Sequence, residues 1–299
     1  MGTSAFAVPA LTQLIRYHKI QAVFTQNAKA SGRGLKIQSS AVCQLANLHN
    51  IAVYTPSTLR SPEILELIQS LDAELIVVCA YGFIIPKAIL DAKRYGCLNI
   101  HPSLLPKYRG AAPLQRAIIN NDTKTAVCIM QMDQGLDTGP IILQQEVELS
   151  GDTILQQLHD QCAEIGSQLL LRVIEQIDVL PRIAQSKDGI SYAHKLMKQE
   201  ARINWHNTAE QINGQIRGMN PWPGSFFLFN DLEIKVRKAS AIDQDHDAKP
   251  GTILDNTMKI ACGKGVLQIH ELQKSGGRIM NIGDFLRGFN FTIGNHLIS

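Results

Sequence analysis

Apolar residues in the first half of the chain gather into short runs that alternate with helix-periodic stretches. Runs at 20–25, 51–54 and 75–80 are typical of strands, and the last of them, LIVVCA, is apolar throughout, as in a strand buried on both faces. Between them, residues 41–48 and 62–69 have the spacing of helices. This alternation predicts the α/β class, with βαβ units and a doubly wound, mostly parallel sheet.

The pattern changes after residue 150. Residues 153–177 predict a long amphipathic helix, and the PRIAQSKDGISYAHKLMKQEA stretch that follows is polar and irregular. From residue 226 onward, short strands separated by turns are typical of a small β-barrel. We therefore predict a first domain over residues 1–180, a basic linker over 181–200 and a second domain over 201–299.

The amino end departs from the expected pattern. A doubly wound domain opens with an apolar strand that feeds a glycine turn and a helix. Here Met1 is followed at once by GTSAFAVPAL. We therefore expect the first strand to be truncated, with an open slot between two inner strands and a poorly stable chain.

Composition narrows the class of protein. Hydrophobic residues make up 45% of the chain, enough for a real core, and the formal charge of +3 is too small to indicate a nucleic-acid partner by itself. The six cysteines are scattered without a CxxC pair, which argues against a disulfide framework and against a zinc site. No apolar run reaches membrane-spanning length and no signal peptide is evident, so we expect a cytoplasmic protein with no membrane partner.

Candidate chemistry is concentrated between residues 97 and 140. Asn99 and His101 lie two apart in an apolar run, so in a strand they share a face, and Pro102 ends the regular pairing. Asp137 lies in the loop GLDTG after a second apolar run, where Gly135 and Gly139 let the backbone fold back closely. Open α/β sheets bind their ligands at such carboxyl ends of strands.

These three side chains suit acyl transfer to an amine. The Asn99 amide can donate to a developing oxyanion, and His101 can donate or shuttle a proton near neutral pH. Asp137 can orient that imidazole and stabilise its charged form. A more ordinary interpretation is that Asn99 caps a turn, His101 packs in the core and Asp137 belongs to a simple turn.

The longer strings carry a family resemblance. NIHPSLLPKYRGAAPLQRAI followed by MQMDQGLDTG resembles the 10-formyltetrahydrofolate-dependent formyltransferases, and RGAAP with QMDQGLDTG is similar to their methionyl-tRNA formyltransferase branch. ARINW and IRGMNPWPGSF resemble the carboxyl-terminal OB-like domain of that branch, which touches tRNA. The resemblance implies Asn99, His101 and Asp137 as the catalytic trio. It also implies folate contacts at Ser103, Leu104, Leu105, Pro106, Tyr81, Gly82, Phe83 and Ile84.

The loop QNAKASGRGLKIQSS carries the implied tRNA contact. Taken alone, its composition is that of a solvated loop. In the resembled family the matching loop inserts at the acceptor stem through the Arg of GRG, which assigns tRNA binding here to Arg33, Gly34 and Lys36. The residues before this motif depart from the family, because its Pro-Asp-Arg-Pro is replaced by the NAKA of residues 27–30.

The resemblance implies a monomeric enzyme that moves a formyl group from 10-formyltetrahydrofolate to the α-amino group of methionyl initiator tRNA, without a metal. In this mechanism the amine attacks the formyl carbon while Asn99 and a protonated His101 stabilise the oxyanion. One alternative is a formyltransferase acting on glycinamide ribonucleotide or an amino sugar. Another is a non-catalytic RNA-binding remnant, which the short amino end favours and the intact trio opposes.

Overall fold

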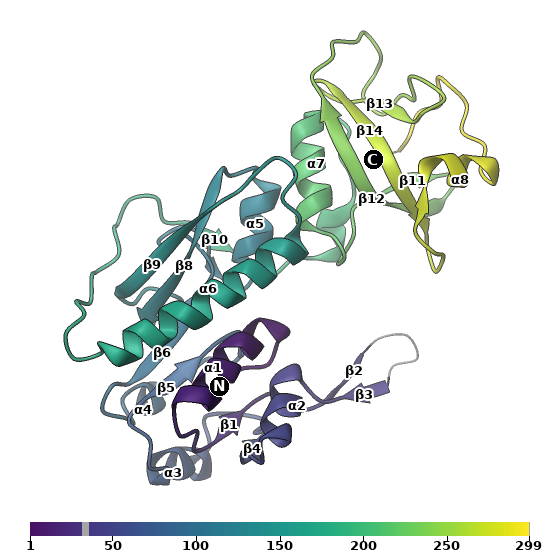
Figure 1. Ribbon diagram of the computed structural model, residues 1–299. Coiled ribbons are helices and arrows are strands. Elements are labelled where there is room, and N and C mark those ends of the chain that lie inside the picture. The colour runs from purple at the N-terminus through teal and green to yellow at the C-terminus, as the bar shows by residue number, and fades with distance from the viewer. Residues whose placement is uncertain (32–35, 299) are drawn as a thin grey trace. The chain divides into compact units, whose positions relative to one another are not determined.

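The computed structural model describes residues 1–31 and 36–298, with only the backbone described at 29–31 and 36–37. The chain forms two compact units, each with its own sheet and helices (Figure 1). The first unit comprises Met1–Pro113, Thr125–Val147 and His159–Ala193, and the second Leu114–Lys124, Glu148–Leu158 and His194–Ser299.

A four-stranded sheet forms the centre of the first unit. β5 (Ile76–Val78) pairs in parallel with β6 (Cys97–His101), and β6 pairs antiparallel with β8 (Lys124–Gln131), which is followed by β9 (Ile141–Glu148). The expected α/β class is confirmed, and the sheet is mixed. Strand direction was not predictable because an apolar run indicates burial on both faces and carries no information on direction.

The strand β6 is packed tightly from both faces. All of its residues are buried, as are residues 125–130 of β8. The long helix α6 (Leu155–Glu175) covers this part of the sheet (Figure 1). A Cβ at Gly166 would lie 2.6 Å from Ile100 Cγ2, so the helix approaches β6 through a position without a side chain. This packing fixes the strand that carries the site.

Two strands near the amino end of the chain form a separate, smaller ladder. β1 (Val23–Phe24) pairs in parallel with β4 (Val53–Tyr54). The remaining elements of the unit are the 3-10 turn η1 (Ala5–Ala7), α1 (Val8–Tyr17), β2 (Lys29–Ser31), β3 (Lys36–Gln38), α2 (Ala41–Leu48), α3 (Pro62–Ser70), α4 (Lys87–Leu90), β7 (Arg109–Gly110) and β10 (Tyr192–Ala193).

A cavity of about 690 Å³ is lined by residues of β1 and β5. The Met1 amine donates to the Val77 carbonyl at 2.6 Å, and the Gly2 N–H donates to the Phe24 carbonyl at 3.0 Å. The first residues thus join the two ladders at the end where both strands finish. Along the rest of their length, β1 and β5 belong to different sheets.

The second unit is built on an antiparallel sheet in the order β11 (Phe226–Phe229), β12 (Leu232–Ile242), β14 (Val266–Lys274) and β13 (Lys259–Ala261). Its core contains the fully buried Trp205, Phe227 and Ile234. β15 (Met280–Asn281) pairs with β14. The helices associated with this unit are α5 (Pro113–Ile119), η2 (Lys198–Ala201), α7 (Ala209–Gly218) and α8 (Ile282–Arg287).

Among residues 1–31 and 36–298, no helix is both long and apolar enough to cross a membrane. No group of His, Cys, Asp or Glu side chains in the same residues has the arrangement of a metal site.

Candidate active site

The strand β6 presents Asn99 and His101 on one face, as the period of two predicts. Asn99 is held through its backbone, which lies in register with Val78 of β5 and Met130 of β8. Its side chain is 9% exposed and has no hydrogen-bond partner among the described residues. An unpaired amide in a buried position remains available to bind a ligand oxygen.

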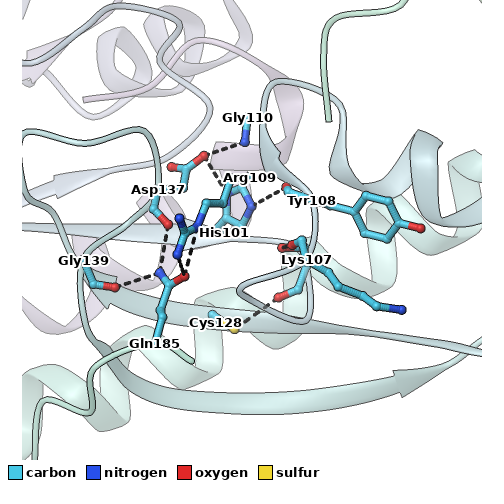
Figure 2. Close-up of polar contacts among 10 residues, drawn as sticks. His101, Lys107, Tyr108, Arg109, Gly110, Cys128, Asp137, Gly139 and Gln185 are labelled. Carbon is cyan, nitrogen blue, oxygen red and sulfur yellow. Dashed lines mark hydrogen bonds and ion pairs between the residues drawn. The ribbon is translucent and has the colours of Figure 1, made fainter. Parts of the chain in front are cut away.

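His101 lies between a backbone carbonyl and a carboxylate (Figure 2). Nε2 is 3.1 Å from the Tyr108 carbonyl oxygen, and Nδ1 is 3.6 Å from Asp137 Oδ2. The carbonyl and the carboxylate can both only accept, so the neutral ring donates to one of them and the protonated ring donates to both. The ring therefore has an acceptor in place for a second proton.

Burial sets the resting charge of this imidazole. It lowers the pKa of His101 from its ordinary 6.5, while the Asp137 carboxylate and the Tyr108 carbonyl raise the pKa by smaller amounts. His101 is therefore neutral near pH 7. This differs from the protonated His101 expected from the sequence, because residue type and spacing do not reveal that the ring is only 4% exposed.

The loop between β8 and β9 places Asp137. Its Oδ2 accepts the Gly110 N–H at 2.7 Å, and its backbone has a φ of 53°. A Cβ at Gly139 would lie 1.9 Å from the Gln131 carbonyl oxygen, so this position requires glycine. Asp133, which the sequence did not single out, accepts from the Gly135 N–H at 3.0 Å. The close fold predicted from the glycines of GLDTG is confirmed.

A partly buried polar network around Gln185 holds this loop (Figure 2). The Gln185 amide donates to the carbonyls of Asp137 and Gly139, both at 2.8 Å. Gln185 Oε1 in turn accepts from Arg109 Nε at 3.1 Å and Nη2 at 2.7 Å. The parallel pairing of β7 with β10 keeps Arg109 in register with Tyr192. Neither Arg109 nor Gln185 was predicted, and Gln185 lies in the stretch predicted to be a linker.

Comparison with known proteins identifies the family. Residues 2–174 match the model of the formyl transferase family, and residues 195–290 match its C-terminal domain. The methionyl-tRNA formyltransferase of Rickettsia africae (strain ESF-5) is 53% identical over 97% of this chain and 96% of its own length. That of Rickettsia bellii (strain RML369-C) is also 53% identical, over 99% and 97%. The chain belongs to the methionyl-tRNA formyltransferase family.

Solved structures share the fold of this family member. A sugar 3N-formyl transferase, WlaRD, superposes with a TM-score of 0.66 at 20% identity, covering 91% of this chain and 95% of its own. A methionyl-tRNA formyltransferase from Clostridium thermocellum gives a TM-score of 0.53 at 21% identity, covering 66% and 86%.

The SLLP segment of this formyltransferase differs in exposure from residue to residue. Ser103 is buried, and its hydroxyl donates to the Lys107 carbonyl at 2.7 Å, while Leu105 packs against the core around Met130. Leu104 and Pro106 are half-buried. Of the four predicted folate residues here, Leu104 and Pro106 therefore have side chains that a ligand can reach.

The YGFI segment follows β5. Tyr81 is buried, and its carbonyl accepts from the Thr3 hydroxyl at 3.1 Å and the Gln26 amide at 2.9 Å. Gly82 has a φ of 82°, which suits glycine. Phe83 packs edge-on against the Tyr81 ring, and Ile84 is 80% exposed. Ile84 is thus an apolar side chain open to a ligand.

Of the three predicted tRNA contacts, the structure describes only the backbone of Lys36. Arg33 and Gly34 fall outside the described residues. Lys36 opens β3, where the backbone pairs with Ser31 of β2, and its side chain is not described.

Proposed function

We propose that this chain transfers a formyl group from 10-formyltetrahydrofolate to the α-amino group of methionine esterified to initiator tRNA, with Asn99, His101 and Asp137 as its catalytic residues. The observation that carries the activity is the 53% identity to methionyl-tRNA formyltransferases over 97% of the chain. The assignment of roles is supported by the buried His101–Asp137 pair and by the unpaired Asn99 amide beside it on β6.

The reaction requires that a new bond be made and a proton moved. The neutral amine attacks the formyl carbon, which forms the N–C bond and places negative charge on the formyl oxygen. The Asn99 amide donates to that oxygen, and a preformed donor in a buried site favours the charge more than water would. The amine proton passes to the unprotonated ring nitrogen of His101, which was neutral beforehand. The bond from the carbon to N10 then breaks, and N10 takes up the proton held by His101 as tetrahydrofolate leaves, which returns the ring to its neutral form.

Asp137 stabilises the protonated form of His101. Once the second ring nitrogen is protonated, the imidazolium has the Asp137 carboxylate at 3.6 Å on one side and the Tyr108 carbonyl at 3.1 Å on the other. Both groups favour the charged ring, so they partly offset the desolvation that keeps His101 neutral at rest. Asp137 and His101 therefore act together as the base.

A reduced folate is the proposed formyl donor. The WlaRD structure was obtained with 5-N-formyl-THF, and a HypX structure from Aquifex aeolicus holds tetrahydrofolic acid. In this chain the accessible apolar side chains of Ile84, Leu104 and Pro106 are suited to a pterin ring. The buried Ser103, Leu105 and Tyr81, with Gly82 and Phe83, shape the segments that carry them.

The acceptor is tested by direct competition. Formyl transfer from 10-formyltetrahydrofolate is measured with methionyl initiator tRNA, glycinamide ribonucleotide and a dTDP-linked amino sugar under the same conditions. We expect transfer to the charged tRNA alone. Preferred transfer to either small amine would replace the proposed acceptor, and no transfer to any of them would favour a non-catalytic RNA-binding protein.

A further inference from the structure

The turn after α7 holds an exposed tryptophan in a fixed position. Trp222 is 49% exposed, whereas Trp205, the other tryptophan of the chain, is buried at 1%. In the structure the backbone of the turn is anchored and the indole faces outward, so the turn presents the ring to solvent.

Arg237 on β12 fixes that turn. Its Nη1 donates to Asn220 Oδ1 at 3.1 Å and to the Pro221 carbonyl at 2.9 Å, and the Asn220 amide donates back to the Arg237 carbonyl at 3.2 Å. A Cβ at Gly224 would lie 2.8 Å from Arg237 Nη1, so the guanidinium fits against a glycine. The turn is thus held on both sides of Trp222 before any ligand arrives, which reduces the conformational entropy of the turn that is lost on binding.

The positive charges of Arg237 and Lys235, which bond to this turn, have few negative partners. The remaining Arg237 donors go to Gln273 Oε1, at 2.8 and 2.6 Å, so among the described residues Arg237 has only neutral partners. Lys235 donates to the Pro223 carbonyl at 2.9 Å, and its nearest carboxylate, that of Glu233, is 3.8 Å away. Two cationic side chains therefore bond to the turn that carries the exposed ring.

We propose that Trp222 is a stacking site for an unpaired base of the bound tRNA, with Lys235 and Arg237 attracting the adjoining phosphates. An aromatic face combined with positive charge is the combination by which proteins hold single-stranded nucleic acid, since every base has a π face and every linkage is anionic. An acidic protein segment would use the charge but not the ring. This inference rests on the proposed use of tRNA as acceptor and extends it to the second unit.

Fluorescence of the full chain tests the contact directly. Acrylamide is uncharged and reaches exposed indoles, so it quenches Trp222 and leaves the buried Trp205 largely untouched. Binding of uncharged initiator tRNA should lower the quenching constant of Trp222 severalfold, and the difference from a Trp222→Phe variant isolates that signal. A blunt-ended RNA duplex with the same number of phosphates should leave Trp222 as quenchable as in the free protein.

Kinetics provide the second readout. Stacking of one base is typically worth about five- to a hundredfold in affinity, so Trp222→Ala should raise KM for charged tRNA roughly tenfold. Its kcat and its KM for 10-formyltetrahydrofolate should not change, and Trp222→Phe should recover part of the loss. Leu232→Ala, which shortens another side chain about half exposed at 52% in the same unit, serves as the matched control and should behave as wild type.

The outcomes separate this inference from the proposed function. If the wild-type chain formylates methionyl-tRNA while bound tRNA leaves Trp222 fully quenchable, the stacking site is wrong and the proposed function stands. Equal protection by the blunt duplex would also overturn it, because no unpaired base would then be involved. If the wild type transfers nothing to methionyl-tRNA, the proposed function fails. The fluorescence result on the wild-type chain stands even if Trp222→Ala does not fold.

Discussion

Replacing Asp137 with Asn tests the proposed base with the smallest change of shape. The amide has nearly the same size, and its oxygen can still accept the Gly110 N–H that now lies 2.7 Å from Oδ2. The loop is also held by the bonds from Gln185 to the Asp137 and Gly139 carbonyls, which the substitution leaves in place. The substitution should therefore remove the negative charge and leave the fold of the loop unchanged.

The magnitude follows from the geometry. Two unit charges 3.6 Å apart, the separation of His101 Nδ1 and Asp137 Oδ2, interact by about 4 to 5 kcal/mol at an effective dielectric constant of about 20. Partial exposure of the carboxylate, at 14%, reduces this through solvent screening. Since about 1.4 kcal/mol corresponds to a factor of ten in rate, we expect kcat to fall at least about a hundredfold.

The pH profile should change in a defined direction. The base must be unprotonated to act, so kcat of the wild type should rise with pH through the pKa of His101, which lies below 6.5 because burial lowers it. Asp137 raises that pKa, so its removal lowers the pKa further. The acidic limb of the Asp137→Asn profile should thus shift to lower pH while its plateau rate falls.

The assay follows formyl-methionine formation on charged initiator tRNA, with tRNA affinity measured separately. Asp133→Asn is the matched control, because it removes a carboxylate from the same loop at an exposed position that faces Gly135 and Thr138 rather than His101. We expect the control to retain kcat within severalfold. Near-normal turnover by Asp137→Asn, with unchanged tRNA affinity, would rule out the paired base.

Three further outcomes are expected. Arg33→Ala should raise KM for charged tRNA and leave KM for 10-formyltetrahydrofolate unchanged, and the reverse pattern in steady-state kinetics would contradict the loop assignment. Gln185→Ala should release the Asp137 loop and leave Arg109 buried without its acceptor, lowering kcat about tenfold or more and also lowering Tm. Adding about five apolar residues before Met1 should raise Tm by supplying a strand to the 690 Å³ cavity between β1 and β5, and equal melting temperatures would show that the cavity accepts no strand.

Local rules predicted the parts of the site that depend on nearest neighbours. The period of two in a strand placed Asn99 and His101 on one face of β6. The need for close backbone approach explained Gly139, whose Cβ would overlap the Gln131 carbonyl. Gln185 escaped prediction because its stretch has no periodicity, and its function comes from bonds to Asp137, 48 residues away in sequence. Nothing in the local pattern specifies such a contact.

The charge of His101 shows why residue types alone could not fix the mechanism. The sequence supplies an imidazole and a carboxylate, and that pair by itself would favour a protonated ring. The fold buries the ring almost completely, which outweighs the carboxylate and lowers the pKa of His101. Burial therefore keeps the imidazole neutral until the attacking amine transfers a proton to it. The Asp137 carboxylate then stabilises the imidazolium that forms. A histidine with the carboxylate alone would hold its proton at rest, and a buried one without it would be too weak a base. Catalysis in this site depends on both conditions holding for the same ring.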